Sequence, residues 1–345
     1  MSSEYNFQSA RRRFVVICTS RCNFNCPHCI RQGFDKQKTN HIDIPFSIFE
    51  LCLGEFKKIN YRHVSFTGGE PILHPEFEKL IAAAAEADYT FNIVSNGWFY
   101  QDYFPILDKY RFHITSLDFS LDGSVASIHD KVRNKRGSYQ KVIEAIKFYK
   151  SKGFPVAAVS CFNQINLNDF HNIYQLVSSL KVDSWRVLAV DNIVGEKNSQ
   201  YYLTDRERLL LQKEIYTLRK IYNFSATPVK LSSATTTKSF LFPPEIEFCR
   251  DLSLDFGTVI FPDGGMLFCC DIYKDCPDRP IVQKDGFWNS FKVAMATIEE
   301  IKKRRLKDIL EGNFFEGFNT CSYCNKYIEE ILKDIKKRES YGSFE

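Results

Sequence analysis

The chain has 345 residues, with 46 Lys and Arg against 42 Asp and Glu, and its formal net charge at pH 7 is +4. A charge this close to balance gives no sign of a nucleic-acid partner. The first residues lack the basic stretch and apolar core of a secretory signal, and no run of about 18 apolar residues occurs. We therefore expect a soluble, cytoplasmic protein with no membrane segment.

Residues 12–222 alternate short β-rich runs with helix-length amphipathic segments, a pattern typical of βα units in a parallel sheet. Six strands are predicted, at residues 14–19, 63–67, 91–95, 117–121, 156–162 and 185–190. Helices are predicted after most of these strands, at residues 48–59, 77–87, 139–150 and 206–222. Right-handed crossovers would curl six such units into a partial (β/α)6 barrel of the TIM type, with its ligand site at the carboxyl ends of the strands.

The periodic pattern stops after this region, and the chain is longer than one ordinary domain of about 100–200 residues. Residues 224–242 are rich in Ser and Thr and are followed by two prolines, so we place a domain boundary there. A small α+β domain is expected at 226–335. It contains a predicted β-hairpin of residues 258–261 and 266–270, and two predicted helices, residues 295–310 and 326–337.

The chain contains twelve cysteines. In a long chain without an export signal, cysteines bind metal or do chemistry more often than they form disulfides. They form an N-terminal group of Cys18, Cys22, Cys26 and Cys29, a C-terminal group of Cys249, Cys269, Cys270, Cys276, Cys321 and Cys324, and two isolated residues, Cys52 and Cys161. The groups are far apart in sequence, so we expect two metal sites, and we expect the two isolated cysteines in the core.

Cys22, Cys26 and Cys29 place three thiols, with the spacing CxxxCxxC, directly after the first predicted strand. A cubane of four irons takes four ligands, so three thiolates would leave one iron open to an external ligand. A structural zinc ion would need a fourth protein ligand, and the candidate, His28, is next to Cys29, from where it would rarely reach the same ion. The spacing therefore favours an iron–sulfur cluster over zinc. Cys18 lies within the strand and is expected to be a small buried residue.

The spacing of these cysteines resembles that of the radical S-adenosylmethionine superfamily. A second motif supports the resemblance, because Thr-Gly-Gly-Glu-Pro follows the second predicted strand and looks like the GGE motif of that family. The resemblance implies that Gly68, Gly69 and Glu70 hold the amino group of S-adenosylmethionine, since glycines allow close approach and a carboxylate complements an ammonium group. Without the cysteines, the two glycines would indicate a tight turn.

The third and fourth predicted strands end in Ser-Asn-Gly and Ser-Leu-Asp-Gly, and a His-Asp pair follows the latter. By the same resemblance, Asn96, Ser120 and Arg133 belong to the part of the site that binds the ribose and carboxylate groups of the cofactor. A polar residue at a strand end can equally cap the next helix. Asn163 and Arg186 are open to the same two interpretations, ligand contact or structural hydrogen bond.

The C-terminal cysteines resemble the auxiliary-cluster domain called SPASM, or its shortened form, twitch. The family pattern is a cysteine, a gap, Gly-x4-Cys and a later CxxC, and four residues meet it: Cys249, Cys269, Cys321 and Cys324. Gly265 and Cys270 have the same spacing as Gly264 and Cys269, and Cys276 is a further spare cysteine. We favour Cys269 because Gly264 follows an aspartate, as in the family. One auxiliary cluster, of the [4Fe–4S] type, is expected, with zinc held by four cysteines as the competing interpretation.

The resemblance implies a radical enzyme with a [4Fe–4S] cluster held by three cysteines and S-adenosylmethionine. An external one-electron reductant of the flavodoxin or ferredoxin type would drive cleavage of S-adenosylmethionine to a 5′-deoxyadenosyl radical, which abstracts hydrogen from an unactivated C–H bond. The auxiliary cluster could accept an electron from the substrate radical. No residue is assigned as a catalytic acid, base or hydrogen donor.

The substrate class is left open between a small molecule and a peptide, because fold analogy does not choose between them. About ten residues precede the first predicted strand, so we expect no domain that binds a peptide leader. This favours a small molecule, or a peptide delivered by a separate partner. An alternative from a different class is a non-catalytic zinc- or iron–sulfur-binding interaction protein.

Overall fold

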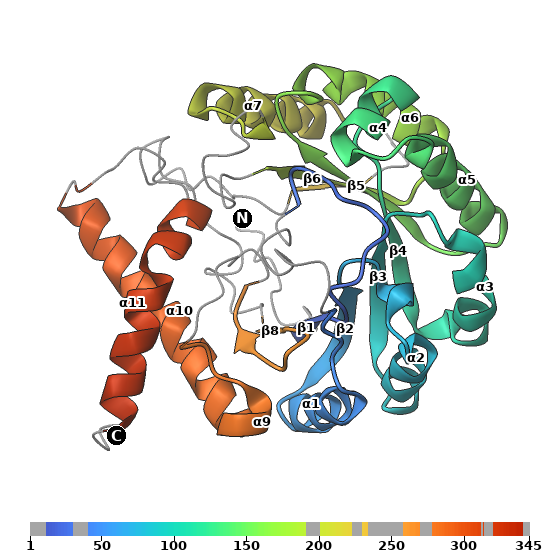
Figure 1. Cartoon of the computed structure of the whole chain (residues 1–345). Coiled ribbons are helices and arrows are strands. Elements are labelled where there is room, and N and C mark those ends of the chain that lie inside the picture. Colours follow the sequence, from blue (N-terminus) through green and yellow to red (C-terminus); the bar gives the residue numbers. More distant parts are fainter. Residues whose placement is uncertain are drawn as a thin grey trace, which may run out of the picture.

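The structure is a computed structural model of the chain, and it describes residues 12–29, 41–190, 201–222, 230–233, 258–269, 278–311, 313 and 320–340. In this part of the chain nine strands form one sheet, in the order β7-β6-β5-β4-β3-β2-β1-β8-β9. The sheet curves, with helices along its outer side, and its first and last strands do not meet (Figure 1). The predicted α/β partial barrel is therefore confirmed.

The strands are β1 Arg12–Ile17, β2 Tyr61–Thr67, β3 Thr90–Ser95, β4 Ile114–Ser120, β5 Val156–Phe162, β6 Ser184–Ala189, β7 Lys230–Ser233, β8 Thr258–Ile260 and β9 Met266–Leu267. All neighbouring pairs are parallel except β8 and β9, which are antiparallel. Parallel neighbours require long crossovers, and helices provide them. Each of the six predicted barrel strands overlaps one of β1 to β6.

The barrel helices are α1 Phe46–Lys58, α2 Phe77–Glu86, α3 Tyr100–Lys109, α4 Ala126–Arg133, α5 Ser138–Ser151, α6 Phe170–Ser179 and α7 Asp205–Tyr222. The four predicted helices correspond to α1, α2, α5 and α7. The sequence analysis did not predict the other three: α6, α3, which contains Pro105, and α4, which buries only His129 and Val132. A proline inside a helix and a nearly polar helix both weaken the apolar periodicity on which the prediction depends.

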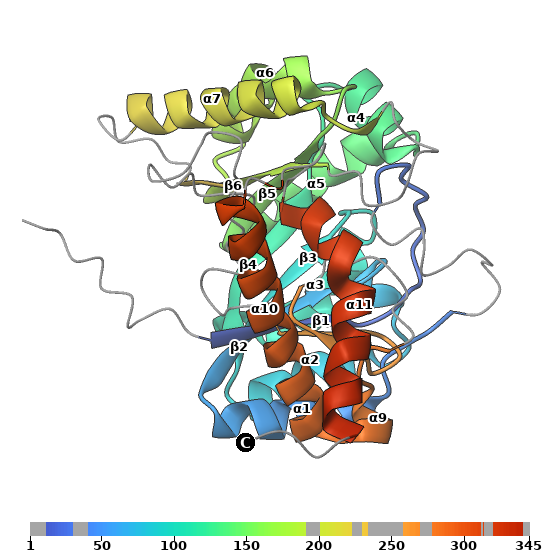
Figure 2. The same ribbon diagram turned by 90° about the vertical axis from the view of Figure 1, so that its left-hand side faces the viewer.

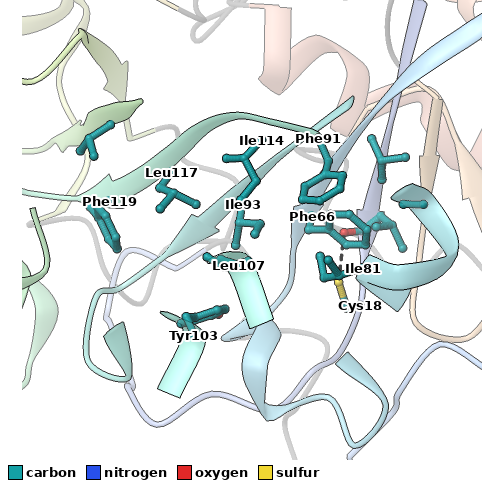
Figure 3. Packing of buried hydrophobic residues seen from close by; sticks show 14 of the residues in the cluster. Cys18, Phe66, Ile81, Phe91, Ile93, Tyr103, Leu107, Ile114, Leu117 and Phe119 are labelled. Carbon is teal, nitrogen blue, oxygen red and sulfur yellow. Dashed lines mark hydrogen bonds between the residues drawn. The ribbon is translucent and has the colours of Figure 1, made fainter. Parts of the chain in front are cut away.

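The main hydrophobic core lies between the outer face of the sheet and these helices (Figure 3). Alternate strand residues point outward, so Phe14 of β1 stacks on Phe56 of α1, with ring centroids 4.5 Å apart. Cys18 and Cys52 are fully buried in this core, as predicted. Cys161 was expected there too, but it is half-buried in β5 and lies outside the core. It belongs to the opposite face of the strand from its outward-facing neighbour Phe162.

The part of the chain beyond α7 adds to the same sheet. Strand β7 lies within residues 224–242, where we predicted the domain boundary, and pairs with β6. The predicted hairpin is present as β8 and β9, and β8 pairs with β1. The sheet edges on both sides of the barrel therefore come from sequence that we had assigned to the linker and the second domain.

The last helices are α9 Val282–Asp285, α10 Phe287–Leu310 and α11 Thr320–Ser340, and α10 and α11 lie side by side (Figures 1 and 2). Helices α10 and α11 pack on the hairpin through a second core that includes Phe261, Phe268 and Ile301. Helix α10 begins earlier than the predicted residue 295, because Phe287 and Ala294 continue its buried face. Helix α11 begins before the CxxC pair and not after it, so Cys321 and Cys324 lie in its first turns. Among the described helices, none is long and apolar enough to cross a bilayer.

Candidate functional site

The segment with the three cysteines follows the carboxyl end of β1. The residues just before the cysteines are bonded to residues 42 and 43, which precede α1. The backbone N–H of Ser20 donates to the carbonyl of Ile42 at 2.8 Å. Arg21 forms a two-pronged ion pair with Asp43, with Nη2 2.9 Å and Nε 3.0 Å from Oδ2. Partial burial alone would raise the pKa of Asp43, but hydrogen bonds from Arg21 and Thr19 hold that pKa below its usual range. The ion pair therefore fixes the cysteine segment, which we call the cysteine loop (residues 22–29), at the end of the strand.

The Gly-Gly pair lets the cysteine loop lie directly on the end of β2. The N–H of Gly69 donates to the carbonyl of Thr19 at 2.7 Å. A Cβ atom on Gly69 would stand 2.0 Å from the carbonyl oxygen of Arg21 and 2.9 Å from Cβ of Cys22, and one on Gly68 would stand 2.9 Å from the Thr19 oxygen. No side chain fits at these distances, so the first cysteine reaches its position only because glycine stands there.

Glu70, the third residue of that motif, lies fully buried at the end of β2. Its carboxylate accepts hydrogen bonds from Ser95 Oγ at 2.7 Å, from the Asn96 N–H at 2.9 Å and from the Tyr103 hydroxyl at 2.5 Å. Burial raises the pKa of Glu70, and these three donors oppose the rise. Glu70 thus ties the ends of β2 and β3 to α3. The sequence did not reveal Tyr103, because it lies on a helix that was not predicted.

The turn after β3 holds the middle of the cysteine loop. Asn96 Nδ2 donates to Asn23 Oδ1 at 2.8 Å, and Asn96 Oδ1 accepts from the Trp98 N–H at 2.9 Å. The ring of Trp98 meets that of Phe24 edge-on, with centroids 5.7 Å apart. The predicted cofactor residue Asn96 therefore binds the stretch between the first two cysteines.

The three cysteines differ in exposure. Cys22 is exposed, Cys29 is half-buried, and Cys26 is 7% exposed. The N–H of Cys29 donates to the carbonyl of Cys26 at 3.0 Å, which folds the CxxC part into one turn. Burial raises the pKa of Cys26 to about 11, with the charge of Cys29 adding to the rise and Arg133 opposing it. Positive charge bound beside these thiols would therefore favour their thiolate forms.

A buried ion pair lies under the loop. Asp122, the third residue of the Ser-Leu-Asp-Gly motif, is fully buried, and its Oδ2 lies 2.5 Å from Nε of Arg133. The Cys161 N–H donates to Asp122 Oδ1 at 2.7 Å, and the Asp122 N–H donates to His129 Nδ1 at 3.0 Å. Burial alone would lower the pKa of Arg133, but the charge of Asp122 and a hydrogen bond with Cys26 raise it above its usual value. The predicted carboxylate-binding arginine thus pairs with a carboxylate of the chain itself, which the sequence did not indicate as its partner.

Ser120 ends β4 with 9% exposure and is level with Val159 of β5, which in turn is level with Arg186 of β6. Arg186 reaches from β6 to the buried Asp118 on β4, at 3.1 Å. The Asn163 side chain accepts from the N–H of Ile165 at 2.9 Å in the turn after β5. Arg186 and Asn163 therefore both have the structural interactions that the sequence left open as alternatives.

The predicted auxiliary ligands lie mostly outside the described residues. Cys249, Cys270 and Cys276 are not among them, and the side chains of Cys321 and Cys324 are not described. Cys269 follows β9 and is 8% exposed in the second core. Gly264 has φ +78° in the hairpin turn, a conformation that favours glycine. The auxiliary ligand set stays a prediction.

Residues 16–177 match the family model of the Radical SAM superfamily. The chain is 24% identical over 340 residues to the antilisterial bacteriocin subtilosin biosynthesis protein AlbA of Bacillus subtilis (strain 168), covering 92% of this chain and 71% of AlbA. It is 23% identical over 213 residues to the AdoMet-dependent heme synthase of Methanosarcina barkeri (strain Fusaro / DSM 804), covering 60% of each. It spans 43% of a second AdoMet-dependent heme synthase, from Oleidesulfovibrio alaskensis, at 21% identity over 49% of this chain.

Solved structures also resemble the fold. Streptococcus suis SuiB bound to S-adenosylmethionine has a TM-score of 0.61 and 17% identity, covering 79% of this chain and 64% of SuiB. Native anSMEcpe with bound AdoMet has a TM-score of 0.64 and 15% identity, covering 94% of this chain and 99% of that chain. At these identities the likeness shows the fold, and the chemistry of this chain has to be argued from its own residues.

Proposed function

We propose that this chain, whose residues 16–177 form a radical SAM domain, is an enzyme that reductively cleaves S-adenosylmethionine and directs the resulting radical at a substrate C–H bond. The observation that carries the proposal is the cysteine loop, whose three thiols are held in place from three sides. Arg21 with Asp43 closes its base, Asn96 holds its middle, and Arg133 contacts Cys26.

The residues present fit an iron–sulfur cluster. Two buried nitrogen atoms beside the cysteines, Asn23 Nδ2 and His28 Nδ1, have no hydrogen-bond partner within the described part of the chain, as expected where a further polar group belongs. The thiolates of a cubane bind separate irons, whereas zinc ligands converge on one centre at about 2.0–2.3 Å. Three cysteines with one further, external ligand are therefore a donor set that suits the cluster.

A [4Fe–4S] cluster bound by Cys22, Cys26 and Cys29 would supply one electron to the sulfonium of S-adenosylmethionine, whose homolysis gives a 5′-deoxyadenosyl radical. The chain itself then has three tasks. The glycine pair brings the loop onto the end of β2. Glu70, Asn96, Ser120 and the backbone of the glycine pair would bind the cofactor at the strand ends. Arg133 would hold Cys26 and compensate negative charge in a buried site.

For the substrate we propose a peptide, with a small molecule as the second candidate. Some relatives bear names that point to peptides, including PqqA peptide cyclase of Rhodopseudomonas palustris, which is 23% identical over 54% of this chain. SuiB has been solved with its precursor peptide SuiA, and anSMEcpe with the peptide Kp18Cys. The inner face of the barrel is polar, since Asp118 there binds both Asn92, at 2.9 Å, and Arg186.

We further propose that residues 12–222 form the catalytic barrel and residues 226–335 an auxiliary-cluster domain. Cys249, Cys269, Cys321 and Cys324 would bind its single [4Fe–4S] cluster. In support, Cys269 follows β9, and α11, whose first turns contain the CxxC pair, packs on the same hairpin. A Cys249→Ala/Cys321→Ala/Cys324→Ala variant should lose the iron of one cluster, and a variant with full iron content would overturn this assignment.

The main experiment is anaerobic purification followed by iron and sulfide analysis and reaction with dithionite and S-adenosylmethionine. Wild-type protein should release 5′-deoxyadenosine, and Cys26→Ala should lose both the product and the iron of one cluster. Cys18→Ala is the matched control, because its buried sulfur faces the core and its loss should cost only about 1–2 kcal/mol of stability. Equal iron content in the two variants would refute the proposal.

The zinc-binding interaction protein is the alternative that metal analysis excludes or supports. A zinc ion at the cysteine loop would need a fourth ligand, for which His28 is the candidate. The structure turns His28 Nε2 toward Asp122, at 4.0 Å, and burial lowers the pKa of His28 to about 4. Colourless protein with one zinc ion at this loop, and no release of 5′-deoxyadenosine, would establish the alternative.

A further inference from the structure

The outer side of the cysteine loop is flanked by a basic surface that the proposed reaction does not use. Six residues at the end of α4 include four basic ones and no acidic one: Lys131, Arg133, Lys135 and Arg136. Arg133 turns inward to Asp122, whereas Lys131 and Arg136 are exposed. The preceding acid, Asp130, is engaged by the start of α5, since it accepts from the N–H groups of Gly137 at 2.7 Å and Tyr139 at 2.8 Å.

This surface lies against the cysteine loop. Asn134 ends α4 in the left-handed conformation, with φ +50°, and donates to the carbonyl of Asn25 at 3.3 Å. The next residue, Lys135, places its ammonium 4.8 Å from the ring centroid of Trp98 and 5.9 Å from that of Phe24. In both ribbon views the blue segment after β1 runs beside α4 (Figures 1 and 2). We call Lys131, Lys135 and Arg136, with Phe24 and Trp98, the basic face.

The basic face includes Phe24, which belongs to the cysteine loop itself. Phe24 stands between Cys22 and Cys26 in the sequence, and Cys22 is exposed. Electron transfer between proteins falls steeply with distance, so a protein donor has to dock where the acceptor is closest to the surface. Positive charge there would steer an acidic partner and raise its rate of association.

We infer that the basic face is the docking surface for an acidic one-electron carrier protein that reduces the cluster at Cys22, Cys26 and Cys29. The inference rests on the proposed function. One electron passes from the reduced carrier to the oxidised cluster, so the carrier is oxidised by one electron and the cluster reduced by one. No bond is formed or broken in this step, and no proton is transferred.

The test is a charge reversal, Lys131→Glu with Arg136→Glu, which leaves Lys135 in place because its ammonium packs on the two rings. The matched control is Lys58→Glu with Lys109→Glu. These lysines end α1 and α3, and since each helix runs back along its strand, they lie at the opposite end of the barrel from the cysteine loop. Both pairs replace two positive charges by two negative ones, so each lowers the formal net charge from +4 to 0.

Each protein is assayed for 5′-deoxyadenosine with increasing amounts of reduced flavodoxin, an acidic carrier, and separately with saturating dithionite. The reversal on the basic face should raise the KM for flavodoxin by about tenfold at low salt. The effect should largely disappear near 1 M salt, where the Debye length is about 3 Å. The rate with dithionite should stay within about twofold of wild type for both variants, because the site behind the basic face is unchanged.

The outcomes separate the two proposals. Wild-type protein that makes no 5′-deoxyadenosine with dithionite overturns the proposed function, and the docking surface with it. Protein that is active with dithionite but whose KM for flavodoxin is the same in the reversal and the control overturns the docking surface alone. The single Arg136→Glu variant, at an exposed position after α4, carries the same prediction at half the charge change. If the double variant binds less iron than wild type, the KM of the single Arg136→Glu variant for flavodoxin is the test of the docking surface.

Discussion

The buried pair of Asp122 and Arg133 gives the sharpest test of how the site is held together. The Asp122 side chain is fully buried, that of Arg133 is 11% exposed, and the two charged groups are 2.5 Å apart. Arg133→Met keeps much of the apolar stem but leaves the Asp122 carboxylate buried without its counter-charge. Breaking such a pair from one side typically costs about 3–5 kcal/mol. We therefore expect the free energy of unfolding of the iron-free protein to fall by that amount.

The assay is urea denaturation of the full chain, followed by circular dichroism, for wild type, Arg133→Met, Asp122→Asn and the double variant. Removing both charges leaves no unpaired ion, so the double variant should be more stable than the sum of the two single losses predicts, by at least about 1 kcal/mol. The Cys161 N–H keeps an acceptor in Asp122→Asn, since the amide retains an oxygen. Additive losses, or a loss below about 1 kcal/mol for Arg133→Met, would refute the reasoning that this pair is buried and mutually compensated.

Two further predictions concern the strand ends beside the loop. Gly69→Ala should lose iron and unfold more easily, because its Cβ would meet the Arg21 carbonyl at 2.0 Å. The control, Gly54→Ala, has nothing within 4 Å of the new Cβ and should gain about 0.5–1 kcal/mol of stability, since residue 54 lies in a helix. Iron content and thermal unfolding of both variants check this, and equal iron loss would contradict it. Burial raises the pKa of Glu70, so the folded protein holds that proton more tightly than the unfolded chain does, and this contribution to stability falls as pH rises from the ordinary value of 4.5 to the raised one. Urea midpoints should therefore show that the stability of wild type, relative to Glu70→Gln, decreases as pH rises through that window. The decrease should be about 1.4 kcal/mol for each pH unit that separates the ordinary pKa from the raised one. A stability difference that does not change with pH would contradict this prediction.

The sequence predicted the barrel well because its strands bury one face against helices. Phe14, Phe66 and Phe91 mark that face, and alternating apolar residues of this kind are visible without any knowledge of tertiary contacts. The short helix α4 escaped prediction because it buries few residues, and β7 because only four residues pair there. Elements whose stability comes from a neighbour and not from their own pattern are not visible in a single sequence.

The site shows the same limit. The cysteine spacing, the glycine pair and Glu70 could be found in the sequence because each motif is local. The partners that hold them could not, since Arg21 meets Asp43 and Glu70 meets Tyr103 across 22 and 33 positions of the chain. Nothing in a local pattern specifies which distant polar groups become neighbours when strand ends converge.

Residues that the family resemblance implies as cofactor ligands are also the residues that hold the cysteine loop. Gly69 admits Cys22 to the end of β2, and Asn96 binds Asn23 between the first two cysteines. Arg133 joins Asp122 to Cys26. A substitution at any of these positions would therefore displace a thiol, because each of these residues contacts the cysteine loop itself. If this is right, Asn96→Ala should lower iron content in the absence of S-adenosylmethionine, whereas a residue that acts only on the cofactor would leave the iron unchanged and raise the KM for S-adenosylmethionine alone.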